Sequence, residues 1–193
     1  MSETPGPKAP RWAWWVATGF GSGYLKPAPG TWGSLAAVLV WFTLHQAALR
    51  LTFLGEGLRM GILLALLLPL PVVWTFLSIR ACTQVVEETG TKDPGWVVAD
   101  EWCGQWIALA PLVLNLMKVE PPLAWDALRL VVPFALFRLF DIWKPGPVNR
   151  LQALPKGQGI VMDDVLAGLF AAILTYGLDR MLLDWWWVHH LAA

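Results

Sequence analysis

The chain has 193 residues, of which 56% are hydrophobic and 15% are charged, and its formal net charge is zero. An average soluble domain carries about 25% charged residues, so this composition argues against a soluble protein and indicates one embedded in a bilayer. The balanced charge provides no basic field that would recruit nucleic acid, which excludes that class of partner.

The N-terminal segment MSETPGPKAPRW lacks the apolar core and the small-residue cleavage site of a signal peptide. Its prolines and polar residues predict a short disordered lead-in over residues 1–10. The rest of the chain, residues 11–193, is predicted to form a single membrane-embedded helical domain.

A bilayer crossing needs about 20 mostly apolar residues, and four stretches approach or reach that length. They are Trp32 to Leu51, Met60 to Ile79, Leu123 to Phe140 and Val165 to Leu183. A fifth stretch, Trp102 to Met117, is short and contains Pro111, so it either spans with a kink or only dips in. The pattern predicts an all-α integral membrane bundle of about four to five hydrophobic helices. A soluble bundle is disfavoured because Leu63 to Val73 contains no polar residue.

Five crossings would place the connections alternately on two faces of the membrane. One face would hold the N-terminal segment and the loops Arg80 to Glu101 and Asp141 to Asp164, which together contain most of the basic residues. The positive-inside bias makes that face cytoplasmic. We therefore expect the acidic residues at the ends of the apolar stretches to gather in cytoplasmic active-site loops.

The first apolar stretch follows two glycine-containing segments, GFGSG at residues 19–23 and PAPGTWGS at residues 27–34. Thr31 is a good N-cap, and the exposed amides at that helix start could bind a phosphate oxygen. Thr31 and Ser34 are therefore candidate phosphate-binding residues. A plain loop and cap is the simpler explanation of the spacing, because glycine-rich turns are common and this one is no Walker loop.

Two adjacent carboxylates, Asp100 and Glu101, come directly before the short apolar stretch. The macrodipole favours acids at a helix N-terminus, so capping explains one of them. Successive residues point about 100° apart on a helix, and two acids in succession are less easily explained by capping. We predict a functional role for at least one of them.

The segment FRLFDIWKPGP places Arg138, Asp141 and Lys144 three residues apart, which stacks them on one helical face until Pro145 ends the helix. An acid at a helix C-terminus opposes the macrodipole, so Asp141 breaks a local rule. A salt bridge to Arg138 or Lys144 is the simpler alternative. That bridge would not account for the acids in the other motifs.

The last acidic motif, Asp163 and Asp164, precedes the final apolar stretch, where capping is again the simple explanation. Ala167 and Gly168 would allow another helix to approach closely and so bring these acids beside the other carboxylates. Acidic clusters with few histidines favour a hard cation such as Mg²⁺, and neighbouring arginine and lysine favour phosphate. Three such motifs on one face predict a metal-dependent enzyme acting on a phosphorylated molecule.

Four segments in this order resemble the phosphatidylglycerophosphatase A family: GFGSGYLKPAPGTWGSLAA, VVADEWCGQWIAL, FRLFDIWKPGPV and GIVMDDVLAG. The resemblance implies a Mg²⁺-dependent removal of phosphate from phosphatidylglycerol phosphate at the bacterial cytoplasmic membrane. It covers the acids expected to serve as metal ligands and as catalytic acids or bases, which are Asp100, Glu101, Asp141, Asp163 and Asp164. Arg138 and Lys144 lie in matched motifs and are expected to bind the substrate phosphate.

Other phosphatase chemistries lack their signatures, since the three histidines fall outside the acidic motifs and neither cysteine has an arginine six residues later. Two other classes of protein stay open at this point. A small ion transporter would usually bury such acids near the bilayer midplane. A structural membrane subunit would need no cluster of acids with arginine and lysine at one face.

Overall fold

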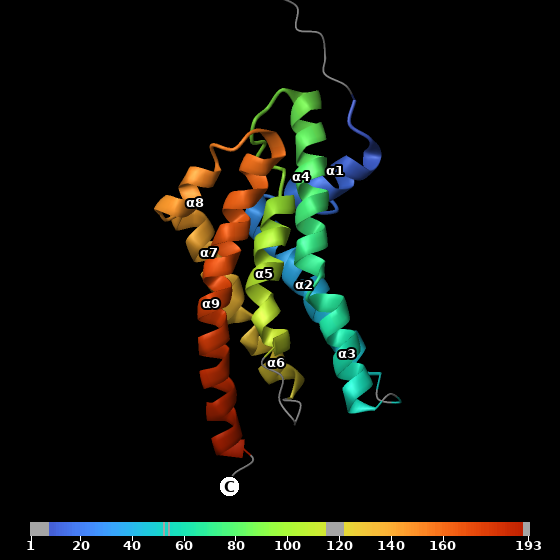
Figure 1. The fold of residues 1–193 in the computed structure, drawn as a ribbon, viewed down its shortest axis with the longest axis vertical. Coiled ribbons are helices and arrows are strands. Elements are labelled where there is room, and N and C mark those ends of the chain that lie inside the picture. The colour runs from blue at the N-terminus through green and yellow to red at the C-terminus, as the bar shows by residue number, and fades with distance from the viewer. Residues whose placement is uncertain (1–7, 52, 54, 115–121, 191–193) are drawn as a thin grey trace, which may run out of the picture.

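The computed structural model describes residues 8–51, 53, 55–114 and 122–190. In chain order its helices are α1 (Arg11–Ala17), the 3-10 turn η1 (Ser22–Tyr24), α2 (Pro29–Leu49), α3 (Glu56–Leu67), α4 (Leu70–Thr89), α5 (Ala99–Leu114), α6 (Leu123–Arg129), α7 (Val131–Trp143), α8 (Gly146–Leu151) and α9 (Lys156–His190). No strand occurs among the described residues. Long helices run along a common axis in an elongated bundle (Figure 1). The all-α prediction is confirmed.

Three helical segments in the described part of the chain are long and apolar enough to cross a bilayer, namely Pro29–Leu49, Glu56–Thr89 and Lys156–Trp186. The other two predicted stretches correspond to α5 and to the α6–α7 pair, which are shorter and pack against the long helices. The protein is therefore a helical membrane protein. Residues 115–117, which end the fifth predicted stretch, lie outside the described residues.

Proline divides two of the apolar stretches. Pro71 has no N–H to donate to the carbonyl of Leu67, and α3 ends at that residue before α4 begins. Pro133 likewise has no N–H for the carbonyl of Arg129, where α6 ends. The prediction of one continuous helix from Leu123 to Phe140 is therefore wrong, because this stretch forms two helices that meet at Leu130.

A buried ion cluster holds α6 against α9. Arg129 donates from Nε to Asp179 Oδ1 at 2.6 Å and from Nη2 to Asp179 Oδ2 at 2.8 Å. Its Nη1 also lies 3.1 Å from Asp126 Oδ1, and the other oxygen of Asp126 accepts from Gln46 Nε2 of α2 at 2.6 Å. Breaking a buried pair by removing one partner is strongly destabilising, so this cluster keeps the short helix α6 in place.

Two glycines let α5 and α9 approach each other closely at the centre of the bundle. A Cβ added to Gly168 of α9 would overlap the backbone of Gly104 in α5. A Cβ on Gly104 would overlap the ring of Phe137 and the carbonyl oxygen of Asp164. Only glycine permits this contact, which brings the start of α5 beside the early turns of α9.

Several loops are shorter than predicted because the flanking helices are longer. The helix α9 begins at Lys156 rather than at Val165. The helix α4 continues to Thr89 and is ended by Gly90, whose φ of 68° is readily adopted by glycine.

Of the predicted lead-in, residues 1–7 lie outside the described residues, and the backbone N–H of Ala9 donates to Glu88 Oε2 at 2.9 Å.

Candidate active site

The acids of the three motifs meet at one end of the bundle, the upper end in Figure 1, where α5 and α9 begin and α7 ends. Asp100 and Glu101 lie in the first turn of α5, and Asp141 lies in the last turn of α7. Asp163 and Asp164 lie in the third turn of α9. Capping therefore does not explain this last pair, and the expectation that these acids stand at a helix start is wrong.

Arg138 joins the acids of α5 and α7. Its Nη1 contacts Glu101 Oε2 and lies 2.9 Å from Asp141 Oδ2. The hydroxyl of Ser34, from the second turn of α2, donates to the same Glu101 oxygen at 2.9 Å. Burial and the negative charge of Asp141 raise the pKa of Glu101, although Arg138 and Ser34 act in the opposite direction.

Lys144 joins the end of α7 to α9. Its Nζ donates to Asp163 Oδ2 at 2.6 Å and lies 3.6 Å from Asp141 Oδ1. The amide of Gln152 donates to the same Asp163 oxygen at 3.0 Å. Burial by itself lowers the pKa of Lys144, but the bond to Asp163 and the charges of Asp164, Asp163 and Asp141 outweigh it and raise that pKa overall. The ammonium group is therefore held in its charged form.

Three carboxylate oxygens of the site are buried without a hydrogen-bond donor among the described residues. They are Asp100 Oδ1, Asp163 Oδ1 and Asp164 Oδ2, and the donor Arg138 Nε is likewise unpartnered. Burial, followed by the charge of Glu101, raises the pKa of Asp100 well above its usual range. Buried polar atoms normally have a hydrogen-bond partner, so we expect each of these oxygens to bind a proton, a water molecule or a cation.

The carboxylate oxygens of the site fit one particular mode of metal binding. Among the described residues, no group of three or more histidine, cysteine, aspartate or glutamate side chains is arranged to hold a metal ion. Mg²⁺ does not require three protein ligands, because it usually keeps several waters and binds through one or two carboxylates together with substrate phosphate oxygens. The unpartnered carboxylate oxygens of Asp100, Asp163 and Asp164 are hard ligands suited to that arrangement.

The start of α2 differs from the prediction. Its N-cap is Ala28, with no side-chain cap bond, so the prediction of Thr31 as an N-cap is wrong. Thr31 is exposed in the first turn, whereas Ser34 is fully buried against Glu101. A Cβ added to Gly30 would overlap the Glu101 carboxylate, so glycine is needed here for α2 to pack against the site.

Sequence reasoning missed two contributions to the site. Gln152 follows α8 and reaches Asp163 only because the chain folds back before α9. Ser34 was predicted to bind phosphate, and its contacts with Glu101 and with Arg138 Nη1 were not predicted. None of these contacts has a local signal, because each joins residues from separate segments of the chain.

Comparison with known proteins gives a family match across most of the chain. A family model described as Phosphatidylglycerophosphatase A matches residues 15–179. A Haemophilus influenzae protein named phosphatidylglycerophosphatase A is 35% identical over 169 residues, covering 87% of this chain and 89% of that protein. An Escherichia coli protein of the same name is 33% identical over 162 residues, covering 83% and 80%.

A third relative has a different name. A Bacteroides thetaiotaomicron protein whose name proposes a phosphatidylinositol-3-phosphatase activity is 38% identical over 159 residues, covering 82% of this chain and 88% of that protein. No solved structure matches the chain significantly. The three relatives have in common names that denote phosphatases acting on phosphorylated lipids.

Proposed function

The chain belongs to the phosphatidylglycerophosphatase A family of phosphatases, and we propose that it hydrolyses phosphatidylglycerol phosphate to phosphatidylglycerol and inorganic phosphate in a Mg²⁺-dependent step of phospholipid biosynthesis. The observation that carries this proposal is that Arg138 and Lys144 pair with carboxylates from different helices at one end of a membrane bundle. Acids with unpartnered oxygens suit a cation, and the two basic side chains suit a phosphate.

The two basic residues receive the substrate phosphate. A phosphomonoester carries close to two negative charges at neutral pH, and Arg138 still has the unpartnered donor Nε. Lys144 is a partly exposed point charge that already bridges Asp141 and Asp163. Glu101 and Asp141 hold the guanidinium of Arg138 in place, so their role is to orient the group that binds phosphate.

We propose that Mg²⁺ is held by one or two of the carboxylates with unpartnered oxygens, which are those of Asp100, Asp163 and Asp164. When bound, the ion would supply positive charge to the phosphate and would make a water molecule more acidic. In the hydrolysis a water oxygen bonds to phosphorus, and the bond from phosphorus to the glycerol oxygen breaks. The water's proton passes to one carboxylate of the cluster, and the departing glycerol oxygen takes up a proton from a protonated carboxyl group of the same cluster.

The test of this function is phosphate release by the purified protein in detergent, with phosphatidylglycerol phosphate and phosphatidylinositol 3-phosphate as substrates. We expect turnover of the first lipid to stop on chelation with EDTA and to return with Mg²⁺. Undiminished turnover after complete metal removal would reject the metal ligands proposed above. A clear preference for phosphatidylinositol 3-phosphate would reject the substrate but leave the phosphatase chemistry in place.

We also propose that the protein is a multi-pass component of the bacterial cytoplasmic membrane with its active site facing the cytoplasm. The end of the bundle that holds the site is rich in basic residues. These are Lys8, Arg11, Lys26, Arg80, Lys92, Lys144, Arg150 and Lys156. The opposite end has fewer, such as Arg50 and Arg59.

Cysteine labelling in intact cells tests this orientation. The exposed positions Lys92 and Ala153 flank the site, whereas exposed Leu58 lies near the start of α3 at the other end, and both native cysteines are buried. A membrane-impermeant thiol reagent should label Leu58→Cys from outside the cell and should reach Lys92→Cys and Ala153→Cys only after lysis. Labelling of Lys92→Cys and Ala153→Cys from opposite sides would reject the topology.

A further inference from the structure

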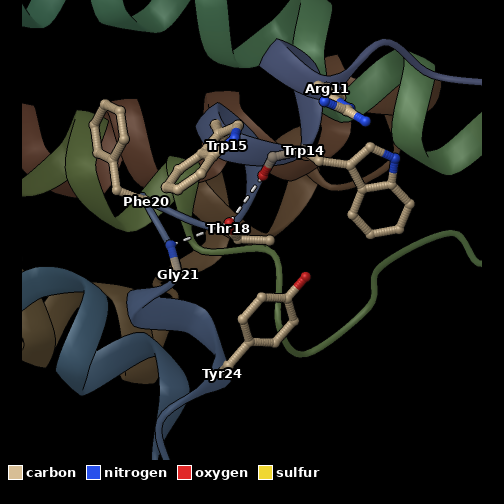
Figure 2. A pocket seen from close by; sticks show the side chains of 7 residues that line it. All are labelled: Arg11, Trp14, Trp15, Thr18, Phe20, Gly21 and Tyr24. Carbon is tan, nitrogen blue, oxygen red and sulfur yellow. Dashed lines mark hydrogen bonds between the residues drawn. The ribbon is translucent and has the colours of Figure 1, made fainter.

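A pocket that shares no lining residue with the acid cluster lies between α1 and η1. It has a volume of about 320 Å³ and is lined mainly by four aromatic side chains, Trp14, Trp15, Phe20 and Tyr24, with Arg11 on the same side as the Trp14 ring (Figure 2). None of these residues belongs to the acidic motifs. The pocket therefore has a different chemistry from the site described above.

The walls of the pocket are held by the bundle behind them. Trp14 donates from its indole Nε1 to Glu88 Oε2 at 3.0 Å and stacks on Trp96 with ring centroids 5.1 Å apart. Phe20 packs against Trp74 and Trp102, with centroid separations of 5.6 and 5.5 Å. Small-molecule sites are usually largely preformed and lined by hydrophobic and aromatic side chains, and this pocket has both properties.

The aromatic rim is strongly exposed. Trp15 is 60% exposed, Phe20 55% and Tyr24 59%. Large aromatic side chains with a polar tip are enriched where a membrane protein crosses from hydrocarbon to water. Because the protein is a helical membrane protein and this segment leads directly into the spanning helix α2, the rim is positioned to meet lipid.

The charged side chain in the lining of the pocket is that of Arg11, whereas the carboxylate of Glu88 accepts from the Trp14 indole without being part of the lining. Arg11 is exposed and forms no ion pair with another described residue. The sequence contains no acidic residue between Glu3 and Glu56, whereas Lys8 and Lys26 flank the pocket-forming segment. An aromatic cage by itself would also suit a quaternary ammonium group, but an arginine in the lining disfavours a cation and favours a phosphate.

We propose that this pocket binds an anionic phospholipid of the surrounding bilayer. Arg11 pairs with the lipid phosphate, and the glycerol and first acyl methylenes lie against Trp15, Phe20 and Tyr24. The bound lipid holds α1 at the membrane surface beside the start of α2. The proposal concerns a site separate from the catalytic cluster and does not rest on the reaction proposed above.

Native mass spectrometry of the full chain tests the proposal, after reconstitution with a mixture of phosphatidylserine and phosphatidylcholine. Phosphatidylserine is the probe because it is neither the proposed substrate nor the product. We expect the wild type to retain phosphatidylserine preferentially and Arg11→Gln to lose about fivefold of that preference, as expected for one basic residue near an anionic surface. Arg11→Lys should keep most of it, and Trp15→Ala should reduce retention of both lipids.

Two matched variants separate this site from other sources of binding. Arg150→Gln removes an exposed arginine of α8 outside the pocket, and Asp141→Asn alters the catalytic cluster. Both should retain phosphatidylserine as the wild type does. Equal retention by Arg11→Gln and wild type, preferential retention of phosphatidylcholine, or loss in Asp141→Asn but not in Arg11→Gln would each overturn the proposal.

The chain's own residues 1–7, which lie outside the described part, are the alternative occupant. Deleting residues 2–7 should leave phosphatidylserine retention unchanged if the pocket takes a lipid from the bilayer. A several-fold rise in retention after this deletion would identify the N-terminal residues as the occupant and would overturn the proposal.

Discussion

The ammonium group of Lys144 lies 2.6 Å from Asp163 Oδ2, which ties the residue that ends α7 to the third turn of α9. Asp163 is almost completely buried, whereas the side chain of Lys144 is partly exposed. The pair therefore joins the interior of the site to its opening. A substrate phosphate that enters the site therefore meets the ammonium group of Lys144, which Asp141 and Asp163 already hold in position.

Replacing Lys144 by glutamine should lower kcat/KM for phosphate release by about ten- to a hundredfold, because a hydrogen bond to a charged group contributes about 1.5–3 kcal/mol. Lys156→Gln is the matched control, since that lysine forms an exposed pair with Glu87 at 2.5 Å. Exposed pairs contribute about 0–1 kcal/mol, so the control should lose little activity. Equal losses in the two variants would contradict the assignment of Lys144 to phosphate.

Neutralising the acids of the cluster should stop turnover without unfolding the protein. We expect Asp141→Asn and Asp164→Asn each to reduce phosphate release by about a hundredfold or more. Asp141→Asn removes the charge that holds Arg138 in place, and Asp164→Asn removes a metal-site or proton-transfer group. Glu87→Gln serves as the control because Glu87 lies in α4 and contacts Lys156. Near-normal turnover in both folded aspartate variants, together with an inactive Glu87→Gln, would place the site elsewhere.

Removing the hydroxyl of Ser34 should change the pH dependence of activity. The bond from Ser34 lowers the pKa of Glu101, so Ser34→Ala should raise that pKa further. Glu101 then ionises at higher pH, and the acidic limb of the kcat/KM profile moves to higher pH. Thr31→Ala, an exposed position on the same helix, should leave this limb in place. An unchanged limb in Ser34→Ala would show that ionised Glu101 is not required.

The close contact of α5 with α9 predicts opposite effects at two glycines of α9. Gly168→Ala should destabilise the protein by about 1–3 kcal/mol, because the new Cβ overlaps the backbone of Gly104. Gly177→Ala should stabilise it by about 0.5–1 kcal/mol, since its Cβ meets nothing within 4 Å and alanine favours the helix. Thermal unfolding in detergent measures both. Equal stability of the two variants would contradict the tight crossing.

Asp100 should make stability depend on pH when metal is absent. Its pKa in the folded state is raised, so the folded protein disfavours the charged carboxylate. The free energy of unfolding is then greatest at a pH below the ordinary aspartate pKa of about 3.9. It falls as the pH rises through the raised pKa of Asp100 in the folded state. In EDTA, Asp100→Asn should melt at a higher temperature than the wild type at pH 8 and at a similar one at pH 4.

Magnesium provides the second part of this measurement. If Asp100 is a metal ligand, adding Mg²⁺ at pH 8 should raise the melting temperature of the wild type more than that of Asp100→Asn, because a ligand stabilises the state that binds it. A wild type that is more stable than Asp100→Asn in EDTA at pH 8 would show that helix capping outweighs burial at this position.

Much of this protein was predictable from local sequence alone. Long apolar stretches with few charges determine an all-α membrane protein, because a backbone in hydrocarbon must satisfy its own hydrogen bonds. The acids at the edges of those stretches, such as Asp100 and Asp141, predicted the site. Charged groups are disfavoured within the bilayer, so acids beside apolar stretches indicate a functional role. The ordered motifs indicated the family.

Tertiary structure decided which side chains meet. Three contacts each connect separate segments of the chain: Ser34 with Glu101, Gln152 with Asp163, and Arg129 with Asp179. Hydropathy and helical periodicity describe only neighbours along the chain, so they contain no information about such pairs. These contacts depend on how closely the helices approach each other, and the volume of the side chains at each crossing sets that distance. The glycines where α5 meets α9 allow the close approach that assembles the site.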